Sequence, residues 1–499
     1  MSDASHEGET GLPVLSPPRN CWRIERTDRA ALIVDAADYF RLARAAMLRA
    51  RSQILLIGWD FDTRLQLVDK DEGVGAPIHL GPLLSWLASK RPYLSIHILA
   101  WDGKMYSFLG RGTTLLRLAE WKLLKRNIHF KLDGKHPLEG CHHHKILVID
   151  DRFACAGGID MTGSRWDTRA HRDDEPGRKR PTTGRHYGPW HDATMAVDGD
   201  AAKALGELGR RRWQLAAGQR LSAPDAQTHP WPDDLEAQFR DVHIGIARTC
   251  GETDEVEEVR EIEALFIDMI HAARRFVYIE SQYFASRAVT EAIAARLAEP
   301  EPPEFVVINP CSADGWLEEA VMGAARADLL KAVREADHEG RFRIYTPVTE
   351  GRRDIYVHAK IMVVDDRLIR VGSANLNNRS MGLDSECDLV IGDAPAEAIA
   401  AVRRDLIAEH LGVTADELMR AEAQTGSIIA AIERLRGEGR SLVPFDPSDY
   451  SEASKALARS EVADPESASE PIEPLAQRKL LRGLRNAARR GARRRRRHA

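Results

Sequence analysis

Two stretches of the chain carry the same polar residues at the same spacing. One runs from His143 to Asp160 and the other from His358 to Asn375, and they align without a gap, with eight of 18 positions identical. In each, a lysine follows the histidine by two positions and an aspartate follows it by seven. A buried strand with a polar end would explain the apolar runs but not the identical polar offsets. The repeat therefore indicates a site that is built twice.

The repeated residues suit the chemistry of a phosphodiester. Alternate residues of a strand lie on the same side, so His143 and Lys145 project together. The same holds for His358 and Lys360. If two halves pack about a pseudo-twofold axis, the lysines can bind the anionic oxygens while one imidazole attacks phosphorus and the other protonates the leaving oxygen. An unperturbed imidazole pKa near ~6.5 allows one neutral and one protonated ring.

The other polar residues of the motifs have expected supporting roles. Asp150 and Asp365 come at the far end of each motif strand, where we expect them to brace loops and lysines without touching substrate. Asp160 and Asn375 are placed to donate or accept hydrogen bonds at the rim of a phosphate site.

The first motif also contains two further histidines. His142 and His144 flank His143, and three consecutive histidines could suggest a metal site. Successive strand residues point to opposite faces, so neither neighbour can join His143 on one ion. No other set of Asp, Glu and His has ligand spacing in the sequence. The sequence predicts neither a metal nor another cofactor.

These features resemble the phospholipase D superfamily, whose signature is a duplicated HxKxxxxD. The resemblance covers about residues 20–410, and further segments place it nearest the phosphatidylcholine-hydrolysing branch: Gly157–Asp160, Arg165–Asp167, Glu280–Phe284, Gly372–Met381 and Asp384–Glu386. It implies an α/β fold of two similar α/β/α sandwich halves, with mixed sheets flanked by helices, related by a pseudo-twofold axis. It also implies a phosphohistidine intermediate, with His143 as nucleophile and His358 as general acid and then base. Sequence symmetry alone leaves those two roles open.

In this family a carboxylate orients each histidine. Asp192 and Glu386, each at the start of the strand after a motif, match those places. Which carboxylate serves which ring stays open. Nearby rivals are Asp167, Asp174 and Asp384.

The motifs require a βα frame that occurs twice. The expected elements of the first half are a helix around Tyr39–Met47 and strands at 54–57, 94–100 and 193–197. After residue 250 the order returns, with a helical face from Val259 to Ile270 and strands at 276–279, 305–308, 357–364 and 389–391. Thr414 to Glu417 reads as a capping box that opens one more helix.

Composition suggests five segments. They are a disordered N-terminus over 1–20, a first half over 21–222, a proline-containing linker over 223–245, a second half over 246–437, and a flexible linker with a disordered Arg-rich tail over 438–499.

The charge distribution restricts the class of partner. Residues from Arg478 onward hold 11 Lys and Arg and no acids, which leaves 60 basic and 76 acidic residues in the remainder. An acidic body is a poor general nucleic-acid binder, so no nucleic-acid partner is expected. The tail from Arg478 to Ala499 could hold the protein on an anionic membrane, or it could be a nucleic-acid or solubility tail.

Other sequence features bear on location. The first 20 residues lack the pattern of a signal peptide, and no run approaches the ~20 apolar residues of a bilayer span. The six cysteines suggest no disulfide framework. We expect a soluble monomer in the cytoplasm that meets the inner face of the membrane peripherally.

Two regions near the motifs have open interpretations. The segment Gly177–Pro181 reads as an exposed loop, either simply solvated or a cationic lip for anionic headgroups. Most of the aromatic residues at strand ends, including Trp316, are expected in the core, but Trp166 or Tyr283 could line a choline subsite.

Three functions fit the motifs. The first is a phospholipase D that hydrolyses a phosphatidylcholine-like membrane phospholipid to phosphatidic acid and free headgroup, with transphosphatidylation to alcohols. The second is a cardiolipin-synthase-type phosphatidyltransferase. The third is a nuclease of the same fold, which the acidic body disfavours. The intact motif residues argue against a non-catalytic binding protein.

Overall fold

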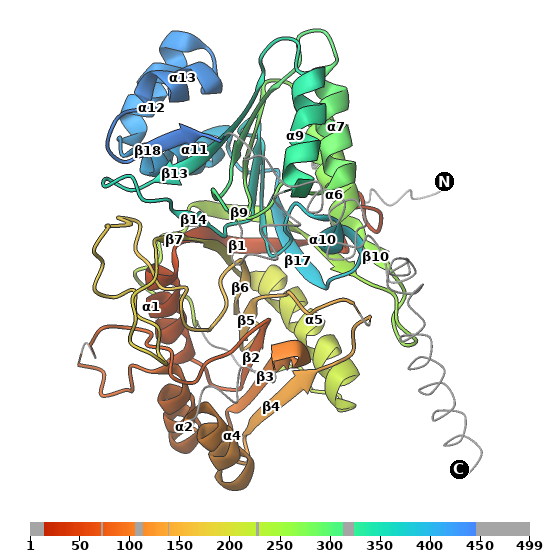
Figure 1. Ribbon diagram of the computed structural model, residues 1–499. Coiled ribbons are helices and arrows are strands. Elements are labelled where there is room, and N and C mark those ends of the chain that lie inside the picture. The colour runs from red at the N-terminus through yellow and green to blue at the C-terminus, as the bar shows by residue number, and fades with distance from the viewer. Residues whose placement is uncertain are drawn as a thin grey trace, which may run out of the picture.

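One mixed β-sheet runs through the whole protein, with helices on both of its faces (Figure 1). The computed structural model describes residues 14–70, 73–104, 113–137, 139–225, 229–312 and 324–445. In these residues the main sheet has 16 strands, and β7 (Trp190–His191) and β14 (Tyr356–Val357) form a separate parallel pair.

The first half of the fold comprises the elements from β1 to α5. Its strands lie in the order β1-β8-β6-β5-β2-β3-β4. Their bounds are β1 Arg23–Val34, β2 Gln53–Gly58, β3 Ser95–Trp101, β4 Ile128–Asp133, β5 Ile146–Ile149, β6 Phe153–Gly157 and β8 Ala193–Asp198. The helices are α1 Ala36–Met47, α2 Leu80–Lys90, α4 Thr113–Leu124 and α5 Gly199–Ala217.

The second half comprises the elements from β9 onward and repeats this order. Its strands run β9-β17-β16-β15-β11-β12-β13, with β18 added at the edge. The bounds are β9 Phe239–Cys250, β10 Val259–Arg260, β11 Phe276–Glu280, β12 Glu304–Ile308, β13 Phe342–Val348, β15 Ile361–Val364, β16 Leu368–Gly372, β17 Glu386–Ile391 and β18 Ser441–Pro444. The helices are α6 Glu261–Ala272, α7 Arg287–Leu297, α9 Ala324–Ala336, α10 Asn378–Gly382, α11 Ala396–Leu411, α12 Ala415–Thr425 and α13 Ile428–Leu435.

The two halves meet along β1 and β9, which occupy the same position in each half. These strands pair antiparallel from Arg23 opposite Ile246 to Ala30 opposite Phe239. The expected fold class, two similar α/β halves with mixed sheets flanked by helices, is confirmed. The sequence did not predict the pairing of β1 with β9, which joins the sheets of the two halves into one.

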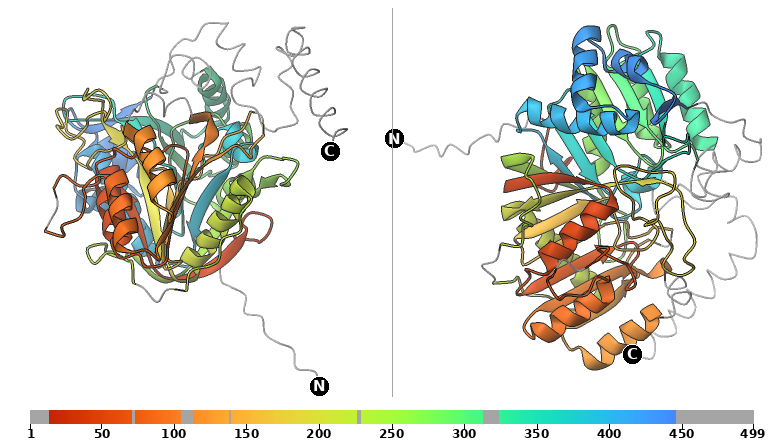
Figure 2. Two further views of the ribbon diagram at one scale, coloured as in Figure 1. Left: turned by 90° about the horizontal axis from the view of Figure 1, so that it is seen from below. Right: turned by 90° about the vertical axis from the view of Figure 1, so that its left-hand side faces the viewer.

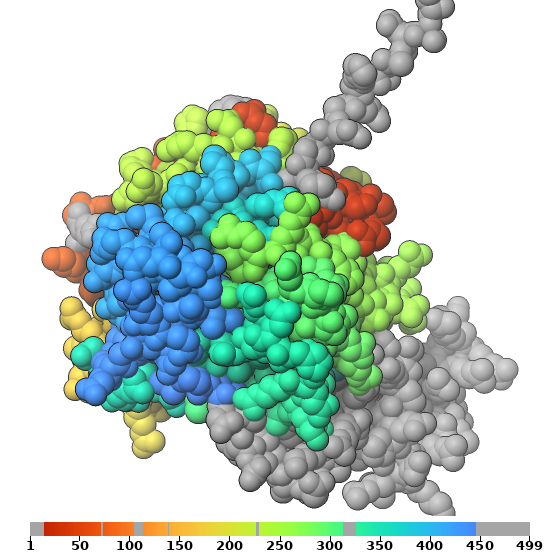
Figure 3. Space-filling view, turned by 90° about the horizontal axis from the view of Figure 1, so that it is seen from above, coloured from red at the N-terminus to blue at the C-terminus, as the bar shows by residue number. Residues whose placement is uncertain are grey.

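Three apolar clusters form the core. One packs α1 and α2 on the first half of the sheet, and a second packs α6, α7 and α9 on the second half. The third packs α5 on the first half and α11 to α13 on the second half (Figure 2), and it contains residues of both halves, such as Val197 and Leu389. Seen end-on, α12 and α13 lie on one side of the second half, and α7 and α9 on the other (Figure 3). Because the third cluster is shared, neither half buries its apolar surface alone.

The structure corrects three predicted segment limits. The linker predicted over 223–245 ends inside β9, which begins at Phe239. The flexible segment predicted from 438 contains β18, which pairs with β13. In the N-terminus predicted as disordered, Asn20 is fully buried and its side chain donates a 2.7 Å hydrogen bond to the carbonyl oxygen of Val14. Residues 1–13 and 446–499, with the Arg-rich tail, lie outside the described residues.

Local signals for helices have clear outcomes. The capping box predicted from Thr414 to Glu417 is confirmed, since each side chain accepts from the backbone of the other residue. Among the described helices, none is both long and apolar enough to cross a bilayer.

The six cysteines are all unpaired in the structure.

Candidate active site

Each motif enters the sheet through a contact with the opposite half. The backbone N–H of His143, just before β5, donates to the carbonyl of Ser385 at 3.0 Å, next to β17. The N–H of His358, just before β15, donates to the carbonyl of His191 at 2.7 Å, next to β8. Each contact continues a short parallel pairing between the two halves. The segment before each motif strand therefore pairs with the opposite half in the same way.

The crossing supplies each motif histidine with a carboxylate from the other half. His143 Nδ1 lies 3.0 and 3.1 Å from the two carboxylate oxygens of Glu386. His358 Nδ1 lies 2.7 Å from Oδ2 of Asp192. Both carboxylates are fully buried, and each leaves Nε2 of its histidine as the nitrogen available to a substrate. The structure therefore assigns a partner to each ring, which the sequence left open.

The rival carboxylates have other partners. Asp167 accepts from His171 Nδ1 at 3.0 Å and pairs with Arg178. Asp384 pairs with Arg379 at 2.8 Å, and Asp174 is exposed.

The motif lysines lie beside their histidines. Lys145 Nζ donates to the carbonyl of His143 at 2.8 Å and lies 3.5 Å from Asp160 Oδ2. Lys360 Nζ donates to the carbonyl of His358. Both lysines are almost fully buried, at 4% and 0% exposure. A buried ammonium group with few partners is suited to an anionic ligand.

The two residues predicted at the phosphate rim differ in what they can donate. Asp160 Oδ1 accepts the backbone N–H of Trp59 at 2.9 Å, and its second oxygen faces Lys145. Asn375 has a buried Oδ1 without a hydrogen-bond partner. The amide of Asn375 can present its NH₂ group to a phosphate oxygen. The carboxylate of Asp160 can only accept hydrogen bonds when ionised, so it cannot donate to a phosphate oxygen. Its contacts indicate that it positions Lys145.

The motif aspartates hold the turns that lead into the neighbouring strands. The carboxylate of Asp150 accepts the three N–H groups of residues 51–53, at 2.7 to 2.8 Å. Asp365 accepts the N–H groups of residues 274–276 over the same distances. The two halves thus use the same brace. Asp150 and Asp365 therefore brace the backbone of the neighbouring loop. The hydrogen bonds of Lys145 and Lys360 go instead to the backbone carbonyls of the motif histidines.

Burial sets the electrostatics around His358. It raises the pKa of Asp192 to about 7, against the opposing effect of Lys360. It lowers the pKa of Lys360 to about 7. Burial also lowers the pKa of His358 well below its usual value, with further contributions from Lys360, Arg165, Lys145 and His143. Since Lys145 and His143 belong to the first motif, the two motifs act on each other electrostatically.

The surroundings of His143 are different. Burial alone would raise the pKa of Glu386, but the charge and hydrogen bond of His143 hold it at about 2. The hydroxyls of Ser373 and Ser380 also donate to this carboxylate. Glu386 is therefore a stable anion, whereas Asp192 is close to its protonation point at neutral pH.

The other histidines of the first motif face away from this pair. His142 bonds Ser385 Oγ at 2.7 Å and lies 3.1 Å from Asp133. Burial lowers the pKa of His144 to about 3. No further set of Asp, Glu and His has ligand spacing in the sequence. The structure brings four such residues together from separate parts of the sequence: Asp35, His171, His191 and Glu409.

An aromatic group beside His358 was not predicted as part of the site. The rings of Trp190 and Tyr356 stack at 4.6 Å, and Trp190 lies 5.2 Å from the ring of His358. The Arg165 guanidinium lies 4.3 Å from the Trp190 ring. A signal was present in the sequence, because Trp190 and Tyr356 each precede a site residue, Asp192 or His358, by two positions.

The loop predicted as exposed at 177–181 is only partly so. Arg178 is 1% exposed and pairs with Asp167, so it is not a solvated charge. Lys179 and Arg180 are exposed, and with Trp166 they line a cavity of about 810 Å³. The other candidate aromatic, Tyr283, accepts from Gln282 at 2.7 Å. Trp316 lies outside the described residues.

Comparison with known proteins agrees with these features. The family profile described as "Cardiolipin synthase, PLD-like domain" matches residues 266–408. Phospholipase D A of Dictyostelium discoideum is 26% identical over 72% of this chain, and phospholipase D alpha 1 of Carica papaya is 25% identical over 76%. These matches support a relationship to the phospholipase D superfamily.

Two further comparisons define the extent of this superfamily relationship. The chain spans 33% of the Dictyostelium protein and 64% of the papaya protein. A crystal structure of phosphatidylserine synthase from Haemophilus influenzae Rd KW20 superposes with a TM-score of 0.51 at 13% identity. The superposition covers 81% of this chain and 95% of that one, which shows a common fold.

Proposed function

We propose that the protein is a phospholipase D. It would hydrolyse the distal phosphodiester of a phosphatidylcholine-like glycerophospholipid to phosphatidic acid and free headgroup, and transfer the phosphatidyl group to alcohols. The observation that carries the proposal is the crossed pair of histidine–carboxylate contacts, His143 with Glu386 and His358 with Asp192. Two such supported imidazoles beside two buried lysines match the needs of a two-step phosphoryl transfer.

His143 is the better nucleophile of the two histidines. Its Nδ1–H donates to Glu386, whose low pKa keeps it ionised, and an anion there strengthens the attack of Nε2 on phosphorus. A bond from His143 Nε2 to phosphorus forms as the bond from phosphorus to the headgroup oxygen breaks. The departing oxygen takes its proton from Nε2 of His358.

His358 needs that proton before the first step. Its pKa is low because it is buried among cations, including Lys360 and Arg165. A bound phosphodiester anion would offset those charges and raise the pKa, so substrate binding would favour the protonated acid. In the second step, neutral His358 takes the proton of water or an alcohol, which attacks phosphorus as the bond to His143 breaks.

The two lysines would bind the non-bridging phosphate oxygens throughout. Each lysine Nζ donates to the carbonyl of its own motif histidine, which fixes the position of the ammonium group relative to the imidazole. Positive charge fixed in a buried site stabilises the added negative charge of the pentacovalent state. Asn375 would donate from its amide at the rim.

The substrate implies a membrane surface, and the protein would act there from the cytoplasm. Arg478–Ala499 could contribute ~1 kcal/mol per basic residue near an anionic leaflet. Exposed Lys179 and Arg180 could add to this attraction at the cavity beside Trp166.

A phosphatidyltransferase of the cardiolipin-synthase type is the second candidate. The match of residues 266–408 to a profile of that description favours it. The same site would serve, with phosphatidylglycerol as both donor and acceptor. A nuclease remains the third candidate, and the acidic body of the chain argues against it.

Product analysis on three substrates separates these functions. Purified protein is incubated with vesicles of phosphatidylcholine, vesicles of phosphatidylglycerol, or single-stranded DNA, each with and without ethanol, and products are measured by mass spectrometry. Phosphatidic acid and choline, replaced in part by phosphatidylethanol when ethanol is present, support the proposal. Cardiolipin from phosphatidylglycerol without choline release would establish the second candidate, and DNA cleavage alone would refute both lipid functions.

A further inference from the structure

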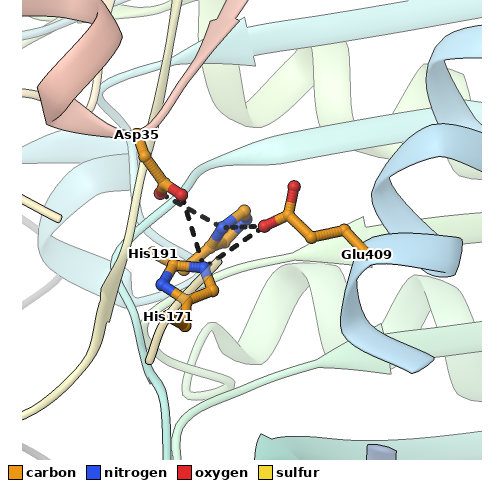
Figure 4. A group of neighbouring side chains, drawn as sticks. All are labelled: Asp35, His171, His191 and Glu409. Carbon is orange, nitrogen blue, oxygen red and sulfur yellow. Dashed lines mark hydrogen bonds and ion pairs between the residues drawn. The ribbon is translucent and has the colours of Figure 1, made fainter. Parts of the chain in front are cut away.

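Four buried or half-buried side chains converge at one place in the fold (Figure 4). They are Asp35 between β1 and α1, His171 in the loop before β7, His191 in β7, and Glu409 in α11. One ligand atom from each lies within 4.8 Å of all the others. The set combines three residues of the first half with one of the second.

Four distances between these side chains are close to the edge lengths of a tetrahedral metal site, with Asp35 facing each histidine through a different carboxylate oxygen. His171 Nε2 lies 3.3 Å from Asp35 Oδ2 and 3.2 Å from Glu409 Oε1. His191 Nδ1 lies 3.3 Å from Asp35 Oδ1 and 3.5 Å from Glu409 Oε1. Nitrogen and oxygen ligands at ~2.0–2.2 Å from a tetrahedral Zn²⁺ are ~3.3–3.6 Å apart.

Both histidines are also held as metal ligands usually are. The remaining nitrogen of His171, Nδ1, lies 3.0 Å from Asp167 Oδ2. The remaining nitrogen of His191, Nε2, lies 2.8 Å from Glu280 Oε2. A carboxylate that accepts from the outer nitrogen fixes the ring and directs the lone pair of the inner nitrogen at the ion.

Two atoms that face the centre of the cluster are left without hydrogen bonds. Asp35 Oδ2 and His191 Nδ1 are buried atoms with no hydrogen-bond partner, in side chains that are 1% and 0% exposed. Buried polar atoms are normally satisfied, so two such atoms in one cluster call for an explanation. A cation bound between them would provide it.

We infer that Asp35, His171, His191 and Glu409 bind one divalent cation of the Zn²⁺ type. Two carboxylates and two neutral imidazoles offer the ion two negative charges and the nitrogen and oxygen ligands that suit it, with Glu409 also paired to Arg169 and Arg440. Two doubly protonated rings would balance the same carboxylates, so protons are the competing occupant. The inference does not depend on the proposed substrate.

The ion would act as a structural clamp behind the site. Asp35 Oδ1 accepts the N–H of Asp192 at 3.0 Å, and the N–H of Asp35 donates to the carbonyl of Asp192 at 2.7 Å. The carbonyl of His191 accepts the N–H of His358. Binding would therefore fix Asp192 and His358 through their backbones and tie α11 of the second half to the first half.

Metal content and stability test the inference without an activity assay. The full-length protein is purified from medium supplemented with Zn²⁺, dialysed, and analysed by elemental mass spectrometry. We expect about one Zn²⁺ per chain, a lower Tm after stripping with chelator, and recovery of the Tm on refilling. Stripped protein titrated with Co²⁺ should show the visible absorption of a tetrahedral site.

Variants assign the ligands. His171→Gln and Glu409→Gln should lose the bound metal, and Glu280→Gln, which removes an outer partner, should weaken Zn²⁺ binding by about 10–100-fold. His97→Gln is the matched control, because His97 is a buried histidine outside the cluster and this variant should keep the metal.

Two results would overturn the inference. One is wild-type protein that is metal-free as purified and shows neither a Co²⁺ spectrum nor a Tm increase with Zn²⁺. The other is a folded His171→Gln or Glu409→Gln variant that binds Zn²⁺ as tightly as wild type. If a variant fails to fold, as judged by circular dichroism, the strip-and-refill measurement on wild type decides alone.

Discussion

At the scale of single residues, the two motif histidines differ in the carboxylate that supports them. Glu386 is held as an anion by His143 and two serine hydroxyls, while burial brings the pKa of Asp192 to about 7. An imidazole with a permanent anion behind it is a stronger nucleophile, and one whose partner sits near its protonation point can give and take a proton more readily. The difference supports unlike roles for residues that the sequence shows as equivalent.

Substitution of the two carboxylates should reveal this asymmetry. Glu386→Gln should lower kcat by about 10³–10⁴-fold, because the amide cannot hold His143 in its reactive tautomer. Asp192→Asn should cost less, since Asp192 is already partly protonated near neutral pH. Single-turnover assays that trap phosphohistidine should show less intermediate in Glu386→Gln. Equal losses in both variants would mean that the two histidines share one role.

The pH dependence of kcat/KM should reflect the pKa of Lys360. Its ammonium form binds the phosphate, and its pKa is lowered to about 7, so kcat/KM should fall as the pH rises through that value. The anionic substrate stabilises the charged lysine, so the alkaline limb of kcat should lie at higher pH than that of kcat/KM. A kcat/KM that stays level well above pH 7 would contradict this account. Lys360→Arg, if folded, should lose the limb.

At the scale of elements, the braces at the far ends of the motif strands matter for stability. Asp150 and Asp365 each collect three backbone N–H groups at the entrance of the neighbouring strand, β2 or β11. Charge-assisted bonds of this kind fix the strand register that the motif residues depend on. These residues recur in both motifs for a structural reason.

Substitution of Asp150 or Asp365 should therefore lower the stability of the fold and affect the reaction only through that loss. Asp150→Ala should lower the free energy of unfolding by about 3 kcal/mol, because it removes the acceptor of three backbone N–H groups, of which that of Gln53 is buried. Asp365→Ala should give a loss of similar size. Asp233→Ala, at an exposed ion pair with Arg49, should change stability by less than about 0.5 kcal/mol. Urea unfolding monitored by circular dichroism measures all three.

Sequence patterns predicted most of these elements but few of the pairings between them. The period of the apolar residues located the strands of both halves, and the Thr414 capping box marked the start of a helix. The partners of His143 and His358 could not be assigned, because each contact crosses between halves far apart in sequence. The burial of Arg178 was missed for a similar reason, since a run of basic residues does not reveal the carboxylate of Asp167. Asp35 and Glu409 lie 374 positions apart, so no local spacing could indicate their cluster.

At the scale of the whole molecule, the two halves share a sheet and a core. The pairing of β1 with β9 makes one sheet, and the cluster that contains Val197 and Leu389 spans both halves. Unfolding of either half would expose the apolar surface of the other. The molecule should therefore unfold as one cooperative unit.

Tryptophan fluorescence can test this cooperativity. Nine of the 10 tryptophans precede β9, so their emission reports mainly on the first half, with Trp190 also stacked on Tyr356 of the second. Leu389→Ala removes a buried side chain of the second half and should lower the stability reported by tryptophan by about 2–5 kcal/mol. Met419→Ala, at a residue that is 42% exposed, is the control and should leave the transition unchanged. An unshifted tryptophan transition in Leu389→Ala would mean that the halves unfold separately.

The crossed support of the histidines also bears on how such a chain could arise. Each ring depends on a carboxylate from across the molecule, so an isolated half would hold an imidazole with no counter-ion. Two copies of one ancestral half, associated through their first strands, would satisfy the same contacts in a homodimer. Fusion of the two genes would then preserve a working centre while freeing each copy to specialise, one toward attack and the other toward proton transfer.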